Sequence, residues 1–107
     1  MELGLRGKVA LVTGGSRGIG RGIAIELAKA GCTLVLSARD EAALRSVAGE
    51  VEALGGRAHV VVADLLAEDA PGRLAQAVGR ETGCLDILVN NAGAVRRGDF
   101  FAMTRKE

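Results

Sequence analysis

The chain has 107 residues, at most one domain, and 49% of them are hydrophobic while 25% are charged. These proportions are average for soluble globular proteins and exclude a disordered chain. Lys and Arg number 14 against 13 Asp and Glu, and this near balance excludes the basic field that nucleic-acid binding needs.

The first strand and the first helix are predicted near the amino end. Lys8–Thr13 is a nearly continuous apolar run, which is typical of a strand covered on both faces of a parallel sheet. The following segment carries apolar residues at spacings of three and four, namely Ile19, Ile23, Leu27 and Ala30. This period predicts a helix with those residues inward, and Gly31 is its expected end.

A second apolar run, Thr33–Ser37, predicts the next strand and precedes the clearest helical pattern. Asp40 is a favoured N-cap residue, and Gly55-Gly56 is the expected end of this helix. The inward stripe expected for this helix consists of Leu44, Val47, Ala48, Val51 and Leu54.

The third and fourth strands are predicted at His59–Ala63 and Asp86–Asn90. Between them a helix is expected to begin at Asp69 or Ala70, because proline is tolerated in a first turn. Its remaining signals are Pro71 in that turn, Leu74, Ala75 and Val78 facing inward, and Gly83 at the end. The alternation of strands and helices predicts a layered α/β fold with parallel strands.

A glycine-rich loop, Thr13–Gly20, joins the first strand to the first helix. Glycines there let the backbone approach a phosphate, and the helix N-terminus supplies free amides and partial positive charge. The spacing is G-x-x-x-G-x-G, and no Lys-Ser or Lys-Thr follows as a Walker A loop requires. The alternative is a plain glycine-rich turn, which the strand before it and the helix after it disfavour.

Three motifs, in this order along the chain, resemble those of the short-chain dehydrogenase/reductase family. Within that family the sequence is most similar in character to the 3-oxoacyl-carrier-protein reductases. The motifs are T-G-x-x-x-G-x-G at 13–20, Asp64-Leu65 after the third strand, and N-N-A-G at 90–93. The resemblance implies an incomplete Rossmann-type doubly wound parallel sheet of about four strands in the order 3-2-1-4. It also implies that 1–107 is an NAD(P)-binding domain of an oxidoreductase acting on a carbonyl/alcohol pair, truncated before the substrate part.

The same resemblance implies a cofactor site at the strand ends. In it Asp64 contacts the adenine, residues 91–93 line a ribose, and Asn90 ties strands together. The cofactor-binding residues that the resemblance implies are Gly14, Ser16, Arg17, Gly18, Ile19, Gly20, Arg39, Asp64, Leu65, Asn91, Ala92 and Gly93.

The end of the second strand favours NADP over NAD. NAD-binding folds carry an acidic residue there for the ribose 2′-hydroxyl, whereas this sequence has Ala38 followed by Arg39. A guanidinium matches a 2′-phosphate in charge and geometry. The resemblance also implies a role for Arg17, because an arginine at this position of the glycine loop reaches the same phosphate in family members that prefer NADP. The alternative is that Asp40 takes the acidic role one place late.

The proton-transfer residue that the family uses is missing from this sequence. The family's Tyr exchanges the substrate proton with help from a Lys and a Ser, and these 107 residues contain no tyrosine. General acid–base assistance contributes about 10²–10⁴-fold in rate. His59 is interpreted as a structural or surface residue, so we expect no catalytic residue, no metal site and no carbonyl reduction by this chain alone.

The cysteines and the hydropathy pattern predict the compartment. Cys32 and Cys84 stand far apart without a redox or metal motif, so both are expected to be buried thiols in a reducing environment. The sequence shows neither a signal-peptide core nor an apolar run of about 18 residues. A soluble, cytoplasmic protein without nucleic-acid or membrane partners is therefore expected.

The last residues, Thr104–Glu107, form a T-x-x-E capping box where the next crossover helix is due. They therefore suggest a sequence that is cut short. Three hypotheses remain: an NADP-binding part of a reductase, a non-catalytic nucleotide-binding module, and an interaction protein whose open sheet edge pairs with a full-length relative or with a second copy. The capping box favours the first.

Overall fold

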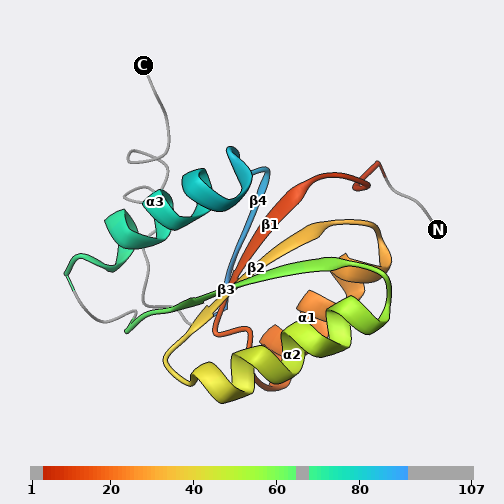
Figure 1. The fold of residues 1–107 in the computed structure, drawn as a ribbon, viewed down its shortest axis with the longest axis horizontal. Coiled ribbons are helices and arrows are strands. Elements are labelled where there is room, and N and C mark those ends of the chain that lie inside the picture. Colours follow the sequence, from red (N-terminus) through yellow and green to blue (C-terminus); the bar gives the residue numbers. More distant parts are fainter. Residues whose placement is uncertain (1–3, 65–67, 92–107) are drawn as a thin grey trace.

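A four-stranded parallel sheet with helices on both faces forms the molecule, and the computed structural model describes residues 4–64 and 68–91 of it (Figure 1). Its strands run in the order β3-β2-β1-β4. The strands are β1 (Val9–Thr13), β2 (Thr33–Ala38), β3 (Arg57–Val62) and β4 (Ile87–Asn90), and the helices are α1 (Gly18–Lys29), α2 (Glu41–Ala53) and α3 (Ala70–Thr82). The predicted doubly wound fold and its strand order are confirmed.

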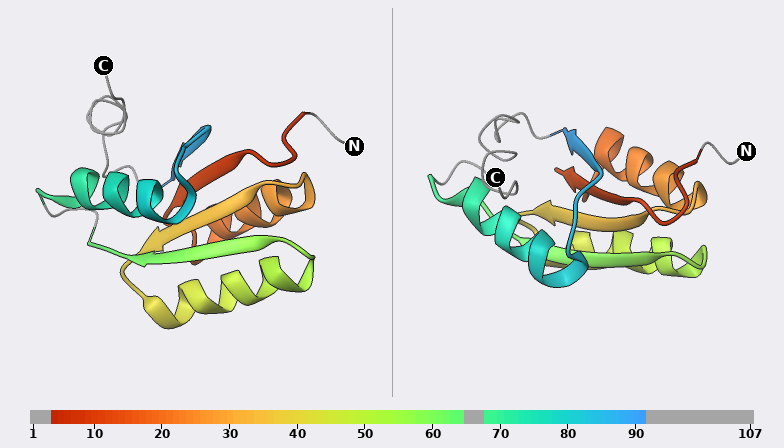
Figure 2. Two further views of the ribbon diagram at one scale, coloured as in Figure 1. Left: turned by 45° about the horizontal axis from the view of Figure 1, so that its top comes forward. Right: turned by 90° about the horizontal axis from the view of Figure 1, so that it is seen from above.

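Each face of the sheet has its own apolar core. Alternate residues of a strand point to opposite faces, so Ala10 and Val12 pack in the core with α1 and α2 residues, whereas Val9 and Leu11 pack with α3. Figure 2 shows α1 and α2 on one face of the sheet and α3 on the opposite face. The two central strands, β1 and β2, are therefore buried on both faces, as their continuous apolar runs predict.

The helix ends follow the predicted signals. Asp40 is the N-cap of α2, and its carboxylate accepts a hydrogen bond from the Ala43 N–H at 3.0 Å. Gly83 ends α3 in the left-handed conformation, with φ 80°, where a side chain would be strained. The third strand is displaced from its predicted bounds, because it begins at Arg57 and ends at Val62.

Two residues of the predicted inward stripes are exposed. Ile19 on α1 is 76% exposed and Leu54, the C-cap residue of α2, is 49% exposed. The buried positions of α1 are Gly20, Ala24 and Ala28. These small residues are four apart and form one face, so α1 meets the sheet through them and Ile19 projects away.

The fourth strand is held to the first at its amino end. The Val9 N–H donates to Oδ2 of Asp86 at 2.8 Å, and the Asp86 N–H donates to the Val9 carbonyl oxygen at 2.9 Å. Parallel pairing then sets Leu11 beside Leu88 and Thr13 beside Asn90. The ends of β1 and β4 are thus brought level with each other.

The two cysteines differ in environment, which corrects the expectation that both are buried. Cys32 is 2% exposed just before β2, whereas Cys84 lies exposed between α3 and β4. The difference arises because Cys32 packs in the core between the sheet and the helices α1 and α2, while Cys84 follows the glycine that ends α3. Across the described ranges, none of the helices is long and apolar enough to cross a bilayer.

Candidate functional site

The carboxyl ends of the strands gather four groups of polar and glycine residues along one edge of the sheet. This follows from parallel pairing, which places the ends of neighbouring strands together. Gly14 follows β1, Arg39 follows β2, Asp64 lies two residues beyond β3, and Asn91 follows β4. The predicted site residues within the described ranges are therefore brought to the same end of the molecule.

The glycine loop leaves β1 in a conformation that suits glycine. Gly14 has φ 66° and Gly18 has φ 54°, values that residues with a Cβ rarely adopt. The Gly14 N–H donates to the Ser37 carbonyl oxygen at 2.8 Å, which anchors the loop to the end of β2. A Cβ added at Gly18 would meet nothing within 4 Å, so the loop is open above this residue.

The first turn of α1 offers its backbone amides to the same opening. Its N-cap residue, Arg17, has an extended backbone and no side-chain capping hydrogen bond. No acidic side chain stands in the first turn, so α1 itself supplies no negative charge to offset the positive end of its dipole. An anion is therefore the group that this end of α1 accommodates best.

Gly20 lies where the glycine loop approaches Asn91, the residue after β4. A Cβ at this position would lie 2.2 Å from the Gly14 carbonyl oxygen and 2.7 Å from Nδ2 of Asn91. The Asn91 amide donates to that same Gly14 oxygen at 3.3 Å. The third glycine of the motif thus makes room for a contact between the loop and the N-N-A-G segment.

Asn90 is placed for the tying role that the family resemblance implies. Its Oδ1 accepts a hydrogen bond from the Thr13 hydroxyl at 3.3 Å, and the same hydroxyl lies 3.3 Å from the Val89 carbonyl oxygen. These contacts join the last residues of β1 and β4. Thr13 is fully buried, so its hydroxyl needs such partners.

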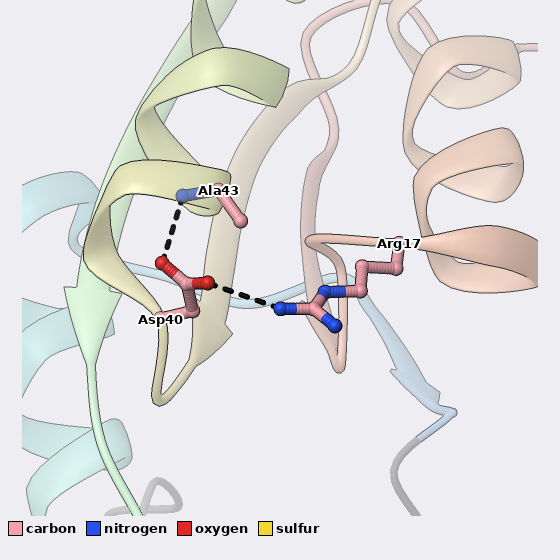
Figure 3. Close-up of polar contacts among 3 residues, drawn as sticks. All are labelled: Arg17, Asp40 and Ala43. Carbon is pink, nitrogen blue, oxygen red and sulfur yellow. Dashed lines mark hydrogen bonds and ion pairs between the residues drawn. The ribbon is translucent and has the colours of Figure 1, made fainter.

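The end of β2 carries an ion pair that the sequence reasoning missed. Nη2 of Arg17 lies 3.1 Å from Oδ2 of Asp40, while the other carboxylate oxygen caps α2 at Ala43 (Figure 3). These contacts hold the pKa of Asp40 below its ordinary value, first through the Ala43 N–H and then through Arg17. The signal was present in the sequence, because both residues precede helices at the ends of neighbouring strands.

Ser37 is a buried polar residue near the end of β2 to which the sequence analysis assigned no function. Its Oγ is buried and has no hydrogen-bond partner among the described residues. An unpaired buried hydroxyl is uncommon and costly. Ser37 is the fifth of the six residues of β2, two positions before Arg39, and its backbone carbonyl oxygen accepts the Gly14 N–H.

Of the remaining predicted site residues, some lie within the described ranges and some lie outside them. Ser16 is half-buried, whereas Arg17, Ile19, Arg39 and Asp64 are exposed. The chain just before Asp64 is held to β2, because the Ala63 N–H donates to the Ala38 carbonyl oxygen at 3.0 Å. Leu65, Ala92 and Gly93 lie outside the described residues.

His59 lies away from this edge. It is on β3, and its Nδ1 is 3.4 Å from Oε2 of Glu81 on α3. The contact joins a strand to the helix that covers it, which is the structural placement expected for this histidine.

The sequence profile of the short chain dehydrogenase family matches residues 8–107. Among curated proteins, the chain is 50% identical over 91 residues to Dehydrogenase/reductase SDR family member 1 of Mus musculus, covering 84% of the chain and 29% of that protein. It is 41% identical over 105 residues to the 3-oxoacyl-[acyl-carrier-protein] reductase FabG of Aquifex aeolicus, covering 97% and 42%. The chain thus spans less than half the length of these relatives.

Solved structures show the same likeness. An L-sorbose reductase from Gluconobacter frateurii, complexed with NADPH and L-sorbose, matches with a TM-score of 0.82 and 40% identity, over 87% of this chain and 36% of that one. RhlG of Pseudomonas aeruginosa, in a complex with NADP, matches with a TM-score of 0.76 and 47% identity, over 84% and 35%. At these identities the likeness covers sequence as well as fold.

Proposed function

We propose that this chain, which belongs to the short chain dehydrogenase family, is the NADP(H)-binding portion of an oxidoreductase that acts on a carbonyl/alcohol pair. The proposed binding domain spans residues 1–107. The observation that carries the proposal is the convergence of an uncapped, open glycine loop with Arg17 and Arg39 at the ends of β1 and β2.

The glycine loop fits a pyrophosphate. The space above Gly18, the uncapped amides of α1 and the absence of an acidic side chain in its first turn together favour a dianionic group. We assign Gly14, Ser16, Gly18, Ile19 and Gly20 to this part of the site.

The remaining assignments follow the ends of the other strands. We assign Asp64 and Leu65 to the adenine, and Asn91, Ala92 and Gly93 to the ribose beyond the pyrophosphate. Support comes from the Asn91 contact with the Gly14 carbonyl oxygen at 3.3 Å, which brings the fourth strand to the loop.

The two guanidinium groups support NADP over NAD. Arg17 and Arg39 are exposed beside the end of β2, where a ribose 2′-substituent is expected to lie. A 2′-phosphate gains charge-assisted hydrogen bonds from guanidinium groups, whereas a 2′-hydroxyl gains less. The matched L-sorbose reductase and RhlG structures contain NADPH and NADP respectively.

The proposal assigns no catalytic residue within these residues. A bound nicotinamide supplies a hydride, while the tyrosine that the family resemblance implies for proton transfer is not in this sequence. We therefore propose that the chain alone binds the cofactor and does not reduce a carbonyl. We also propose a cytoplasmic location, because both cysteines are free thiols in the structure.

Calorimetric titration with two adenosine ligands tests the cofactor assignment. We expect 2′,5′-ADP to bind about tenfold or more tightly than 5′-AMP, because a charge-assisted hydrogen bond contributes roughly 1.5–3 kcal/mol. Arg17→Ala and Arg39→Ala should each weaken 2′,5′-ADP and leave 5′-AMP within about twofold. Equal binding of both ligands by the unmodified chain would contradict the assignment to NADP.

Arg80→Ala is the matched control for these variants. Arg80 is an exposed arginine in the last turn of α3, near the opposite end of the strands from the site. Its removal should leave both affinities unchanged. The proposal that the chain alone does not reduce a carbonyl is tested by measuring NADPH consumption with a panel of ketones. Steady turnover by the purified chain would overturn it.

A further inference from the structure

Arg17, which is proposed to bind the 2′-phosphate, is already paired with the carboxylate of Asp40. Oδ2 of Asp40 lies 3.1 Å from Nη2 of Arg17, and the two side chains are 46% and 76% exposed. Figure 3 shows the guanidinium reaching from the glycine loop toward the first turn of α2. The pair therefore spans the gap between the ends of β1 and β2.

The two carboxylate oxygens of Asp40 make separate contacts. Oδ1 accepts the Ala43 N–H at 3.0 Å and caps α2, whereas Oδ2 holds Arg17. Asparagine caps a helix about as well as aspartate does but carries no charge. The capping role and the charge can therefore be separated by one substitution.

A phosphate dianion is a stronger partner for Arg17 than Asp40 is. Exposed ion pairs contribute little, because water screens them and two flexible side chains must be ordered. A phosphate carries more charge and accepts two parallel N–H bonds from one guanidinium. A 2′-phosphate would therefore displace Asp40, which would remain beside it as a like charge.

We propose that Asp40 is a specificity-determining positioning residue, which competes with the 2′-phosphate of NADP for Arg17 and so limits the preference for NADP over NAD. This inference rests on the proposed function of the site. Asp40 acts mainly by holding Arg17, and its own charge beside the phosphate adds a smaller effect. A ligand with an unmodified 2′-hydroxyl leaves the Arg17–Asp40 pair intact.

Asp40→Asn tests the inference through the ratio of two affinities. We expect this variant to tighten 2′,5′-ADP by about three- to fivefold, since the phosphate no longer has to displace a charged partner from Arg17. The affinity for 5′-AMP should stay within about twofold. A structural effect of the substitution would move both affinities together, so the ratio isolates the 2′-phosphate. Asp40→Ser, which also keeps a capping oxygen, provides a second neutral variant.

Glu52→Gln is the matched control for charge. It removes the same charge from α2, 12 residues from Asp40 and about 18 Å along the helix, beyond the Debye length of about 10 Å at 0.1 M salt. Both affinities should remain within about twofold in this variant.

An Arg17→Met background tests whether Asp40 acts through Arg17. There the gain from Asp40→Asn should fall to about twofold or less, measured as a double-mutant cycle. An equal gain in both backgrounds, or no gain in the original chain, would overturn the inference while the preference of the unmodified chain for 2′,5′-ADP still stood. Failure of the unmodified chain to prefer 2′,5′-ADP would overturn the proposed function as well.

Discussion

Nδ2 of Asn91 donates a hydrogen bond to the carbonyl oxygen of Gly14 at 3.3 Å, across 77 residues of sequence. The contact joins the segment after β4 to the loop after β1, on neighbouring strands. The contact has room because Gly20, in the first turn of α1, presents no Cβ to either group. The conformation of the glycine loop therefore depends on a residue of the first helix and on the residue that follows the fourth strand.

Gly20→Ala should destabilise the chain by about 1–3 kcal/mol, the usual cost of forcing extra atoms into a packed site. Its Cβ would lie 2.2 Å from the Gly14 carbonyl oxygen, so the loop or the helix must shift. Binding of 2′,5′-ADP should weaken along with stability, as measured by urea denaturation and calorimetry.

Gly22→Ala is the control on the same helix. A Cβ at Gly22 would meet nothing within 4 Å, and alanine is favoured over glycine in a helix interior by about 1 kcal/mol. This variant should therefore be as stable as the unmodified chain or more so. Equal effects of the two substitutions would contradict the close approach at Gly20.

Leu44→Ala and Leu54→Ala remove the same atoms from two positions of the predicted stripe on α2. Leu44 is fully buried, whereas Leu54 is 49% exposed. We expect the first variant to lose about 2–5 kcal/mol of unfolding free energy and the second less than about 1 kcal/mol. Urea denaturation of both proteins measures the difference. A large loss at Leu54 would mean that this side chain is buried after all.

The two thiols should react at very different rates with a disulfide reagent. Burial, and to a smaller extent the charge of Asp86, raises the pKa of the Cys32 thiol. A raised pKa means that less thiolate is present at any pH below it, and thiolate is the reactive form. Access to Cys32 also needs local unfolding, so its reaction should be about a hundredfold slower than that of exposed Cys84.

A Cys84→Ser variant isolates Cys32 in this experiment. Its remaining thiol should react slowly in the folded chain and quickly in denaturant, and its raised pKa means that its rate should still rise with pH in the alkaline range. Fast labelling of the folded Cys84→Ser protein would contradict the buried placement of Cys32.

Hydrophobic periodicity and turn residues were sufficient for the order and type of the elements. The apolar runs of β1 and β2 predict central strands, since only strands covered on both faces lack polar alternation. Asp40, Gly31 and Gly83 mark helix ends through local backbone chemistry, and the structure places each of them there. Each of these signals lies within a short segment, so it can be recognised in a single sequence without knowledge of the tertiary structure.

The sequence alone failed where distant segments decide the outcome. The helical spacing of apolar residues includes Ile19 in the predicted inward stripe of α1. The helix nevertheless meets the sheet through Gly20, Ala24 and Ala28. Periodicity identifies a face only to within about one residue, and close packing of the backbone against the sheet selects the small side chains.

The chain by itself determined a parallel α/β fold with a glycine loop at the end of its first strand, because both follow from patterns within short segments. Only the tertiary structure decided that Asn91 reaches Gly14 and that Arg17 meets Asp40. Those contacts arise because parallel pairing aligns the carboxyl ends of neighbouring strands. Residues separated by 23 and 77 positions in sequence thereby come within hydrogen-bonding distance.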